Sequence, residues 1–431
     1  MGYTKRLAAR EKELGRPVRV GIIGAGQMGS GLVAQVHRAV GMDVVAVADI
    51  AIERAESALK NAGREDVVVE NDVAKASALI EQGKAVALTD GLQVPKLPVD
   101  IVLEVSGMPD IAAQIAWASL MAKKDVALMT VEADITVGLL LSTVANAGNN
   151  IYTICRGDEP VECVKLVEYA EDLGLKVVVV GKGKNNPNRP TDTPDDIMAE
   201  ALAKGMNPKM LCSFTDGTKT QLEMASLANA TGFKVEVPGM HGIQCDVDGL
   251  QAAMQPVASG GIVEGTEPIV EYVTGNVAPG VFVVVKSEND VVTHELEYLK
   301  MGKGPYFALY RPYHLASIEA SLSIGEAILD REASFQSKYW TAEVTAKAKS
   351  DLKAGLKLEG IGGHHVHGWT IDAGDARAMN AIPIGLVAGC TLKRDVPAGA
   401  TLTYDDVEVD ETRPLVALRR LQDALIANGT L

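Results

Sequence analysis

The sequence predicts an α/β protein with a doubly wound Rossmann domain, an α+β domain and a small β-rich domain. Over residues 17–150, apolar segments of strand length alternate with amphipathic helical segments, which is typical of a parallel sheet covered by helices. The alternation changes after residue 150, and two short segments of similar pattern follow residue 340. We therefore place the domains at 1–150, 151–340 and 341–431.

The first domain reads as a regular series of strands and helices. The composition of the strand over 44–50 indicates burial on both faces, as in a parallel sheet. The predicted elements are a helix over 2–16, strands over 18–23 and 44–50, a helix over 51–63, a strand over 99–107, a helix over 110–124 and a strand over 125–130.

The rest of the chain has a mixed pattern. The long segment 181–196 is rich in Pro, Gly and Asn and predicts a loop. The other predicted elements are a helix over 161–175, a strand over 176–183, a helix over 217–232 that ends at Gly232, strands over 280–287, 292–302 and 304–315, and a helix over 323–330.

Composition excludes several classes of protein. The net charge is -15 without a long basic run, and aromatic residues make up 4%, so a nucleic-acid partner is not expected. No apolar stretch is long enough to span a membrane. Five cysteines without a CxxC pair, and an N-terminus without an apolar signal core, indicate a reducing compartment, which we take to be the cytoplasm.

The strongest motif is Gly24-Ala25-Gly26-Gln27-Met28-Gly29, which follows a strand and opens a helix. In this context the glycines predict a dinucleotide-binding turn, with the pyrophosphate at the helix N-terminus. Asp49 ends the next strand and is placed to accept a hydrogen bond from a ribose 2′-hydroxyl. The alternative is a tight turn in a Rossmann-like domain that binds no nucleotide.

The choice between NAD and NADP depends on two charges. The Asp49 carboxylate repels a 2′-phosphate and favours NAD, whereas Arg54 offsets that charge or belongs to a solvated helix face. Glu104, Ser106 and Gly107 end a strand at the sheet edge that lines the ligand crevice of such folds. We assign them to the cofactor site, although Glu104 has a second interpretation as an anchor for a neighbouring loop.

Two groups of carboxylates are candidate metal ligands. Asp158 and Glu159 are adjacent oxygen donors of the kind that Mg²⁺ and Mn²⁺ prefer. Pro160 supports the alternative that this pair caps a helix. Asp216 precedes a predicted helix that contains Lys219, so both residues are site candidates or helix caps.

Two polar clusters are candidate substrate sites. The loop brings together cations and amides that suit a phosphate or the hydroxyls of a sugar; the alternative is an ordinary solvated loop. Tyr310, Arg311 and His314 follow an apolar strand, and Arg311 would clamp an anion while His314 transfers a proton. The alternative is that His314 is a structural histidine with its hydrogen bonds satisfied. The loop residues concerned are Lys182, Lys184, Asn185, Asn186 and Arg189.

These motifs resemble known families. VGIIGAGQMGSGL, VADI and VDIVLEVSG resemble the nucleotide-binding half of homoserine dehydrogenases. DLKAGLKLEGIGG and KRDVPAGATLTYDDV are similar to a SAF domain, a small β-rich module. Together with GKGKNNPNRP and GPYFALYRPYHL, nearly the whole chain resembles the 1-deoxy-D-xylulose 5-phosphate reductoisomerase-like enzymes of some bacteria.

That resemblance implies a specific function. The family rearranges 1-deoxy-D-xylulose 5-phosphate with a divalent metal and reduces the product with NADPH to 2-C-methyl-D-erythritol 4-phosphate, in isoprenoid biosynthesis. It implies a homodimer formed through the middle domain, and a phosphorylated substrate held by Lys182, Lys184 and either Arg189 or Arg311. Mg²⁺ or Mn²⁺ would be held by carboxylates, with Asp158, Glu159 and Asp216 as candidates.

Two other functions stay open. One is a dehydrogenase for another hydroxy acid or sugar acid, which would explain Asp49 directly and would need no metal. The other is an NAD(P)-binding regulatory protein without turnover. The dense polar loop 181–196 argues against the regulatory protein, because a cofactor sensor needs no such cluster.

Overall fold

The computed structural model describes residues 2–431, which form two compact units. Unit 1 contains the described residues up to Val161, with 315–336 and 413–431. Unit 2 contains residues 162–314 and 337–412. Each unit therefore combines stretches that are far apart in the sequence. The domain boundaries predicted at residues 150 and 340 stay predictions.

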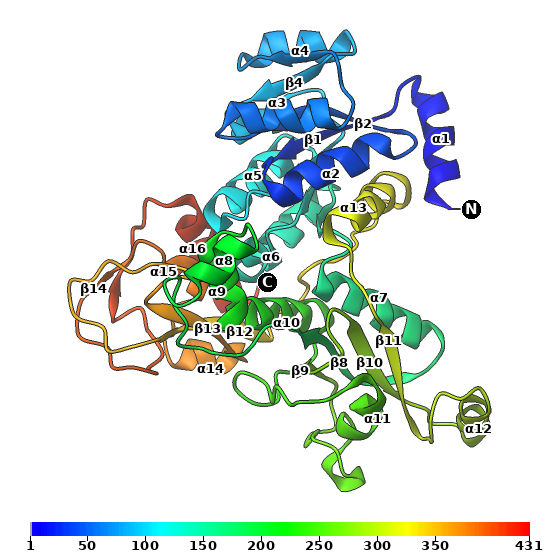
Figure 1. The fold of residues 1–431 in the computed structure, drawn as a ribbon, viewed down its shortest axis with the longest axis vertical. Coiled ribbons are helices and arrows are strands. Elements are labelled where there is room, and N and C mark those ends of the chain that lie inside the picture. The colour runs from blue at the N-terminus through cyan, green and yellow to red at the C-terminus, as the bar shows by residue number, and fades with distance from the viewer. Residues whose placement is uncertain (1) are drawn as a thin grey trace. The chain divides into compact units, whose positions relative to one another are not determined.

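Unit 1 is built on a seven-stranded parallel sheet with the order β3-β4-β2-β1-β5-β6-β7 (Figure 1). The apolar side chains of its central strands are almost completely buried, as expected when helices cover both faces. The predicted Rossmann-like α/β fold is confirmed. The strands are β1 (Val18–Ile23), β2 (Met42–Ala48), β3 (Val67–Val69), β4 (Ala85–Leu88), β5 (Ile101–Glu104), β6 (Asp125–Leu128) and β7 (Tyr152–Ile154).

The helices of unit 1 come from three parts of the chain. Helix α13 packs against α2, and α16 packs against α5 and α6. The two late segments therefore complete the helical layers of an early sheet. The helices are α1 (Tyr3–Leu14), α2 (Gln27–Arg38), α3 (Ile52–Asn61), α4 (Val73–Glu81), η1 (Gly91–Lys96), α5 (Pro109–Met121), α6 (Val131–Gly148), α13 (Ala316–Gly325), η4 (Glu326–Asp330) and α16 (Pro414–Ala427); α7 (Glu159–Asp172) begins in unit 1.

Unit 2 contains a four-stranded mixed sheet with the order β11-β10-β8-β9. Strand β10 runs antiparallel to β8 and β11, and β8 runs parallel to β9. A two-stranded ladder, β12 with β13, and the short pair β14 with β15 complete its strands. The strands are β8 (Lys176–Lys184), β9 (Ile269–Thr274), β10 (Val281–Lys286), β11 (Tyr306–Arg311), β12 (Ala342–Ala348), β13 (Val366–Asp372), β14 (Thr391–Leu392) and β15 (Val407–Glu408).

Helix α10 (Thr218–Thr231) lies at the centre of unit 2 and packs against β9, β12 and β13. It confirms the helix predicted over 217–232, and Gly232 ends it in the left-handed conformation. The other helices of the unit are α8 (Met198–Ala203), α9 (Pro208–Thr215), η2 (Val247–Gly249), α11 (Leu250–Ala253), η3 (Val257–Ser259), α12 (Asp290–Tyr298), α14 (Ala373–Ala378) and α15 (Ile384–Val387).

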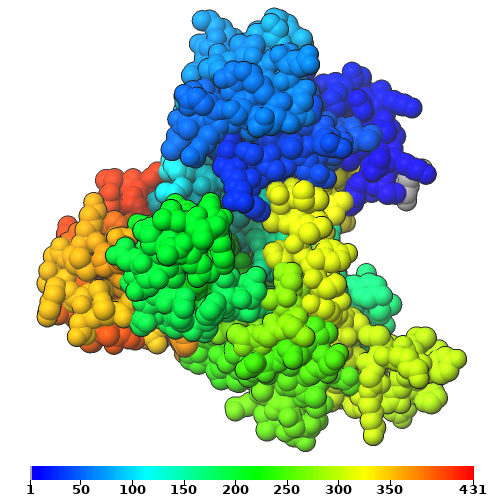
Figure 2. Space-filling view, viewed as in Figure 1, coloured from blue at the N-terminus to red at the C-terminus, as the bar shows by residue number. Residues whose placement is uncertain are grey.

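Two predicted elements were wrong. Residues 292–302 do not form a strand, because the Asn289 side chain accepts hydrogen bonds from the Val291 and Val292 N–H groups and starts helix α12. This helix lies at the surface of unit 2, in the yellow-green part of Figure 2. The predicted loop over 181–196 begins later, because β8 continues to Lys184.

The predicted SAF domain is also corrected. Residues 337–412 belong to the same compact unit as residues 162–314. Strand β13 is tied to α10 by hydrogen bonds from the Gly368 N–H to the Thr218 hydroxyl and from the Thr370 N–H to Gln221 Oε1. These buried contacts make the segment part of the core of unit 2.

Across residues 2–431, we find no helix with the length and apolar character that crossing a membrane requires.

Candidate functional site

The three glycines of the turn after β1 have different structural roles. Gly24 has a φ of 101°, and a Cβ there would lie 2.7 Å from the Val105 carbonyl oxygen. A Cβ on Gly29 would lie 2.1 Å from the Gly24 carbonyl oxygen, so α2 packs on the turn only if residue 29 is glycine. A Cβ on Gly26 would meet nothing within 4 Å. The second glycine therefore leaves open space, as the approach of a pyrophosphate requires.

The N-terminus of α2 faces this open space. Gly26 is the N-cap residue, and no side chain of the described chain caps it. The first turn of any α-helix leaves N–H groups without intrahelical partners, and the helix dipole favours an anion there. Gln27 and Met28, the next two predicted cofactor residues, are exposed at the start of the helix. The turn therefore fits the phosphates of a dinucleotide.

Asp49 lies just beyond the end of β2 and holds the glycine turn in place. Its Oδ2 accepts a hydrogen bond of 2.8 Å from the Ala25 N–H, and its Oδ1 accepts one of 2.9 Å from the Ala51 N–H. The carboxylate is half-buried and directly adjoins the predicted pyrophosphate turn. Arg54 is exposed on α3. Asp49 is thus hydrogen-bonded to the turn itself.

Glu104 ends β5 and is completely buried. Its Oε1 accepts hydrogen bonds from the backbone N–H and the hydroxyl of Ser106. Its Oε2 has no hydrogen-bond partner among residues 2–431. Burial raises the pKa of Glu104 to about 7. Glu104 therefore anchors the loop that directly follows β5. Its assignment to the cofactor site stays a prediction.

The loop that Glu104 anchors packs against the glycine turn. The Cβ position of Gly24 lies 2.7 Å from the Val105 oxygen and 3.0 Å from the Ser106 nitrogen. Gly107 has a φ of 69°, and its N–H donates a hydrogen bond of 3.1 Å to the Thr130 hydroxyl. The predicted cofactor residues of β1 and β5 thus meet at one edge of the sheet.

Unit 2 contains a buried group of charged side chains. Lys182 on β8 forms an ion pair with Glu223 on α10, and both side chains are less than a tenth exposed. Lys219 lies one turn before Glu223, 3.9 Å from its carboxylate, and is 18% exposed. The structure therefore joins two predicted catalytic lysines through a carboxylate that sequence analysis did not select.

The candidate residues Tyr310 and Arg311 end β11, and His314 follows it. Arg311 forms an ion pair with the buried Glu162 and lies 4.8 Å from the centre of the Tyr313 ring. The Tyr310 hydroxyl donates a hydrogen bond to the Val277 carbonyl oxygen at 2.8 Å. His314 is half-buried at the end of this segment of unit 2. Tyr310 therefore has a structural partner, whereas Arg311 and His314 stay candidates.

Asp216 is engaged by protein groups. Its Oδ2 lies 2.8 Å from the Lys349 ammonium, and neither side chain is more than 1% exposed. Its Oδ1 accepts a hydrogen bond of 2.8 Å from the Thr218 N–H at the start of α10. Both oxygens serve the fold of unit 2, so this donor set does not fit a catalytic metal.

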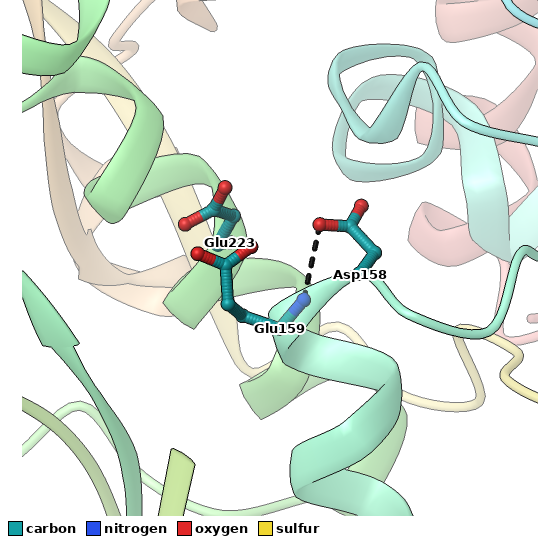
Figure 3. Close-up of side chains that lie close together, drawn as sticks. All are labelled: Asp158, Glu159 and Glu223. Atoms are coloured by element: carbon teal, nitrogen blue, oxygen red, sulfur yellow. Dashed lines mark hydrogen bonds between the residues drawn. The ribbon is translucent and has the colours of Figure 1, made fainter. Parts of the chain in front are cut away.

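Asp158 and Glu159 lie at the start of α7 in unit 1 and are half-buried. Asp158 Oδ1 accepts a hydrogen bond of 3.1 Å from the Glu159 N–H (Figure 3). A side-chain oxygen on a backbone N–H at a helix start, followed by Pro160, supports the capping interpretation. Their assignment as metal ligands stays a prediction.

The predicted substrate loop lines a pocket of about 620 Å³ in unit 2. Lys184 is buried, and burial lowers its pKa to about 8. Arg189 lies outside the pocket lining and pairs with Asp192 at 2.9 Å. The lining residues are Lys184, Asn185, Asn186, Pro187, Asn188, Gly242, Gln244, Thr274, Gly275 and Ala278.

Sequence analysis missed a histidine–carboxylate pair beside this pocket. His241, the neighbour of Gly242, places Nδ1 2.8 Å from Glu271 Oε2. Glu271 is fully buried and also accepts hydrogen bonds from the N–H groups of His241 and Gly242. This carboxylate raises the pKa of His241. The pair was missed because 30 residues separate its members and no local pattern connects them.

Comparison with known proteins gives one family match. The model described as "Oxidoreductase DRL, catalytic domain" matches residues 157–320. No curated protein matches the chain. The match supports an oxidoreductase, and no finer activity follows from it.

Several solved structures resemble the chain at low identity. A probable dehydrogenase from Thermotoga maritima is 15% identical with a TM-score of 0.40, and the match covers 73% of this chain and 90% of that one. A myo-inositol dehydrogenase from Corynebacterium glutamicum is 10% identical with a TM-score of 0.42, covering 73% and 89%. A scyllo-inositol dehydrogenase from Lactobacillus casei is 12% identical with a TM-score of 0.42, covering 74% and 89%.

These comparisons correct the predicted function. The family model that matches residues 157–320 is described as an oxidoreductase catalytic domain. The prediction of a 1-deoxy-D-xylulose 5-phosphate reductoisomerase in isoprenoid biosynthesis is therefore wrong, and the match supports an oxidoreductase. The engagement of Asp216 by Lys349 agrees with this correction, because it removes one of the three predicted metal ligands. The nicotinamide cofactor stays a prediction, and nothing in the comparisons supports a divalent metal.

Proposed function

We propose that the chain is an NAD(P)-dependent dehydrogenase that oxidises or reduces a small sugar acid or another hydroxy acid. The observation that carries the proposal is the open space at Gly26, between two glycines that the packing itself requires. That arrangement leaves a glycine-lined approach to the N-terminus of α2, where a pyrophosphate is favoured. A nicotinamide, when bound, supplies the hydride acceptor or donor.

We propose NAD(H), rather than NADP(H), as the cofactor. Asp49 adjoins the glycine turn, and its negative charge disfavours a ribose 2′-phosphate, whereas it accepts from a 2′-hydroxyl. Arg54, the nearby cation in the sequence, is exposed on α3. We expect NADH to bind at least about tenfold more tightly than NADPH. An Asp49→Ser variant should reduce that difference.

The proposed substrate chemistry belongs to unit 2. Oxidation of an alcohol removes a hydride from carbon and a proton from oxygen, so a group near the oxygen must take up that proton. Lys219 is the proposed proton-transfer residue, because it is the more exposed of the two lysines that share Glu223. In the oxidation, the unprotonated Lys219 amine would take up the proton, Glu223 would hold that side chain in place, and the Lys182 ammonium would stabilise negative charge on the substrate oxygen.

The test is turnover of the purified full chain with NAD⁺ and a panel of sugar acids, hydroxy acids and inositols. Reduced nicotinamide is followed by its absorbance, with and without EDTA. We expect turnover of at least one acid that EDTA leaves unchanged, and a loss of about a hundredfold in kcat for Lys219→Met. Tight NADH binding without turnover of any panel member would instead support a regulatory protein. Activity that EDTA abolishes and Mn²⁺ restores would contradict the metal-free reaction.

A further inference from the structure

Lys184 differs from the other buried cations of unit 2. Lys182 pairs with Glu223, Lys349 with Asp216, and Arg311 with Glu162. The Lys184 ammonium donates only to two backbone carbonyl oxygens, Phe214 at 2.6 Å and Pro187 at 3.1 Å. Within residues 2–431, no carboxylate lies within 4 Å of it.

This arrangement leaves the positive charge of Lys184 without a carboxylate in direct contact. Lys184 is 5% exposed, and a buried ammonium is costly unless an anion pairs with it. Its two carbonyl partners use two of its three donors. One N–H of the ammonium is therefore not used by these two partners. Burial and the neighbouring Lys182 lower the pKa of Lys184, whereas the charges of Asp216 and Glu223, which are not in direct contact with it, raise that pKa.

The pocket around Lys184 is polar and of ligand size. A volume of about 620 Å³ is in the range of small-molecule sites. Asn185, Asn186, Asn188, Gln244 and Thr274 line it. Amide side chains offer both donors and acceptors, which is the pattern that matches neighbouring hydroxyl groups on a sugar chain.

We propose that this pocket binds the acid group of a small polyhydroxylated ligand, with Lys184 as its counterion and the lining amides on its hydroxyls. The identification of that ligand with the dehydrogenase substrate rests on the proposed function. The binding itself does not. A carboxylate and a phosphate ester share the required charge, so the experiment must separate them.

The test is isothermal titration of the full chain with D-gluconate, D-glucose 6-phosphate, inorganic phosphate and the neutral polyol D-sorbitol. We expect an acid sugar to bind at least about tenfold more tightly than D-sorbitol, and Lys184→Met to remove that difference. Lys176→Met, an exposed lysine at the other end of β8, is the matched control and should bind as the wild type. Lys184→Arg should restore part of the affinity.

The outcomes distinguish a carboxylate from a phosphate ester, and they distinguish a failure of this inference from a failure of the proposed function. Binding of D-gluconate alone identifies a carboxylate, binding of D-glucose 6-phosphate alone a phosphate ester, and binding of both a shared anion site. If Lys184→Met fails to fold, Gln244→Leu takes its place in the test. Gln244 lies at the exposed rim of the pocket, and its replacement should weaken binding because the ligand hydroxyls lose a contact. Equal binding of all ligands by the wild type and Lys184→Met, or no binding, overturns the inference. Acid binding by a chain that does not bind NADH would overturn the proposed function alone.

Discussion

Glu104 brings a buried carboxyl to the edge of the predicted cofactor site. Its surroundings include Glu132 from α6, which raises its pKa further, and Tyr152 and Cys155 from the β7 region, whose own pKa values it raises. Because the folded pKa is about 7 and the ordinary value is 4.5, the folded chain holds this proton more tightly than the unfolded chain. The free energy of unfolding should therefore fall as the pH rises from the ordinary value through the folded value.

We predict that Glu104→Gln flattens this pH dependence. The uncharged amide cannot lose a proton, so the variant avoids the cost of a buried carboxylate. At about pH 8 the variant should be as stable as the wild type or more stable, by up to about 3 kcal/mol. Urea unfolding at several pH values measures the difference. The same slope in both proteins would contradict the burial argument.

The ion pair between Lys182 and Glu223 allows a second prediction at this scale. Glu223→Gln removes the charge while keeping the volume, and the buried Lys182 ammonium loses this carboxylate partner. We expect the free energy of unfolding to fall by about 3 to 5 kcal/mol. Glu200→Gln removes an exposed partner of Lys204 and is the matched control, with an expected cost below about 1 kcal/mol. Equal effects in urea unfolding would show that the buried charge is not stabilised by this pair.

Among the elements, the turn between β1 and α2 requires glycine at Gly29 but has room for a side chain at Gly26. A Cβ on Gly29 would lie 2.1 Å from a backbone oxygen. Neither β1 nor α2 can remove this clash without moving. A Cβ on Gly26 would meet nothing, and its φ of -69° suits any residue. We therefore predict that Gly29→Ala lowers the melting temperature by several degrees, whereas Gly26→Ala leaves it unchanged. Differential scanning calorimetry checks both, and a destabilised Gly26→Ala would contradict the open space.

The elements that sequence predicted correctly are those with strong local signals. β1, α2 and β2 follow from buried apolar runs and from glycines at fixed spacing, and α10 follows from its Gly232 stop. The predicted strand over 292–302 failed because its apolar residues were read without the Asn289 N-cap. Val291 and Tyr298 are 77% and 72% exposed. Apolar composition alone therefore could not show that this segment is a surface helix.

At the scale of the whole molecule, contacts between distant segments determine what the sequence could not show. α13 and α16 join the sheet of unit 1 although about 160 or more residues separate them from β7, and β13 is tied to α10. Such pairings depend on tertiary packing, so the local periodicity of the sequence does not predict them. For the same reason the candidate site was predicted in part. The glycine turn was visible as a motif, whereas Glu223 and His241 became candidates only through their partners.

The central claim is that the turn at Gly26 holds a nicotinamide dinucleotide. The measurement is a titration of the full chain with NADH, followed by the fluorescence of the bound nicotinamide, for the wild type and for Gly26→Val. The side chain of Gly26→Val would occupy the open space without touching the protein backbone that Gly24 and Gly29 contact. We predict saturable binding by the wild type and at least about tenfold weaker binding by a folded Gly26→Val. Equal binding by both proteins, or none by the wild type, would contradict the account.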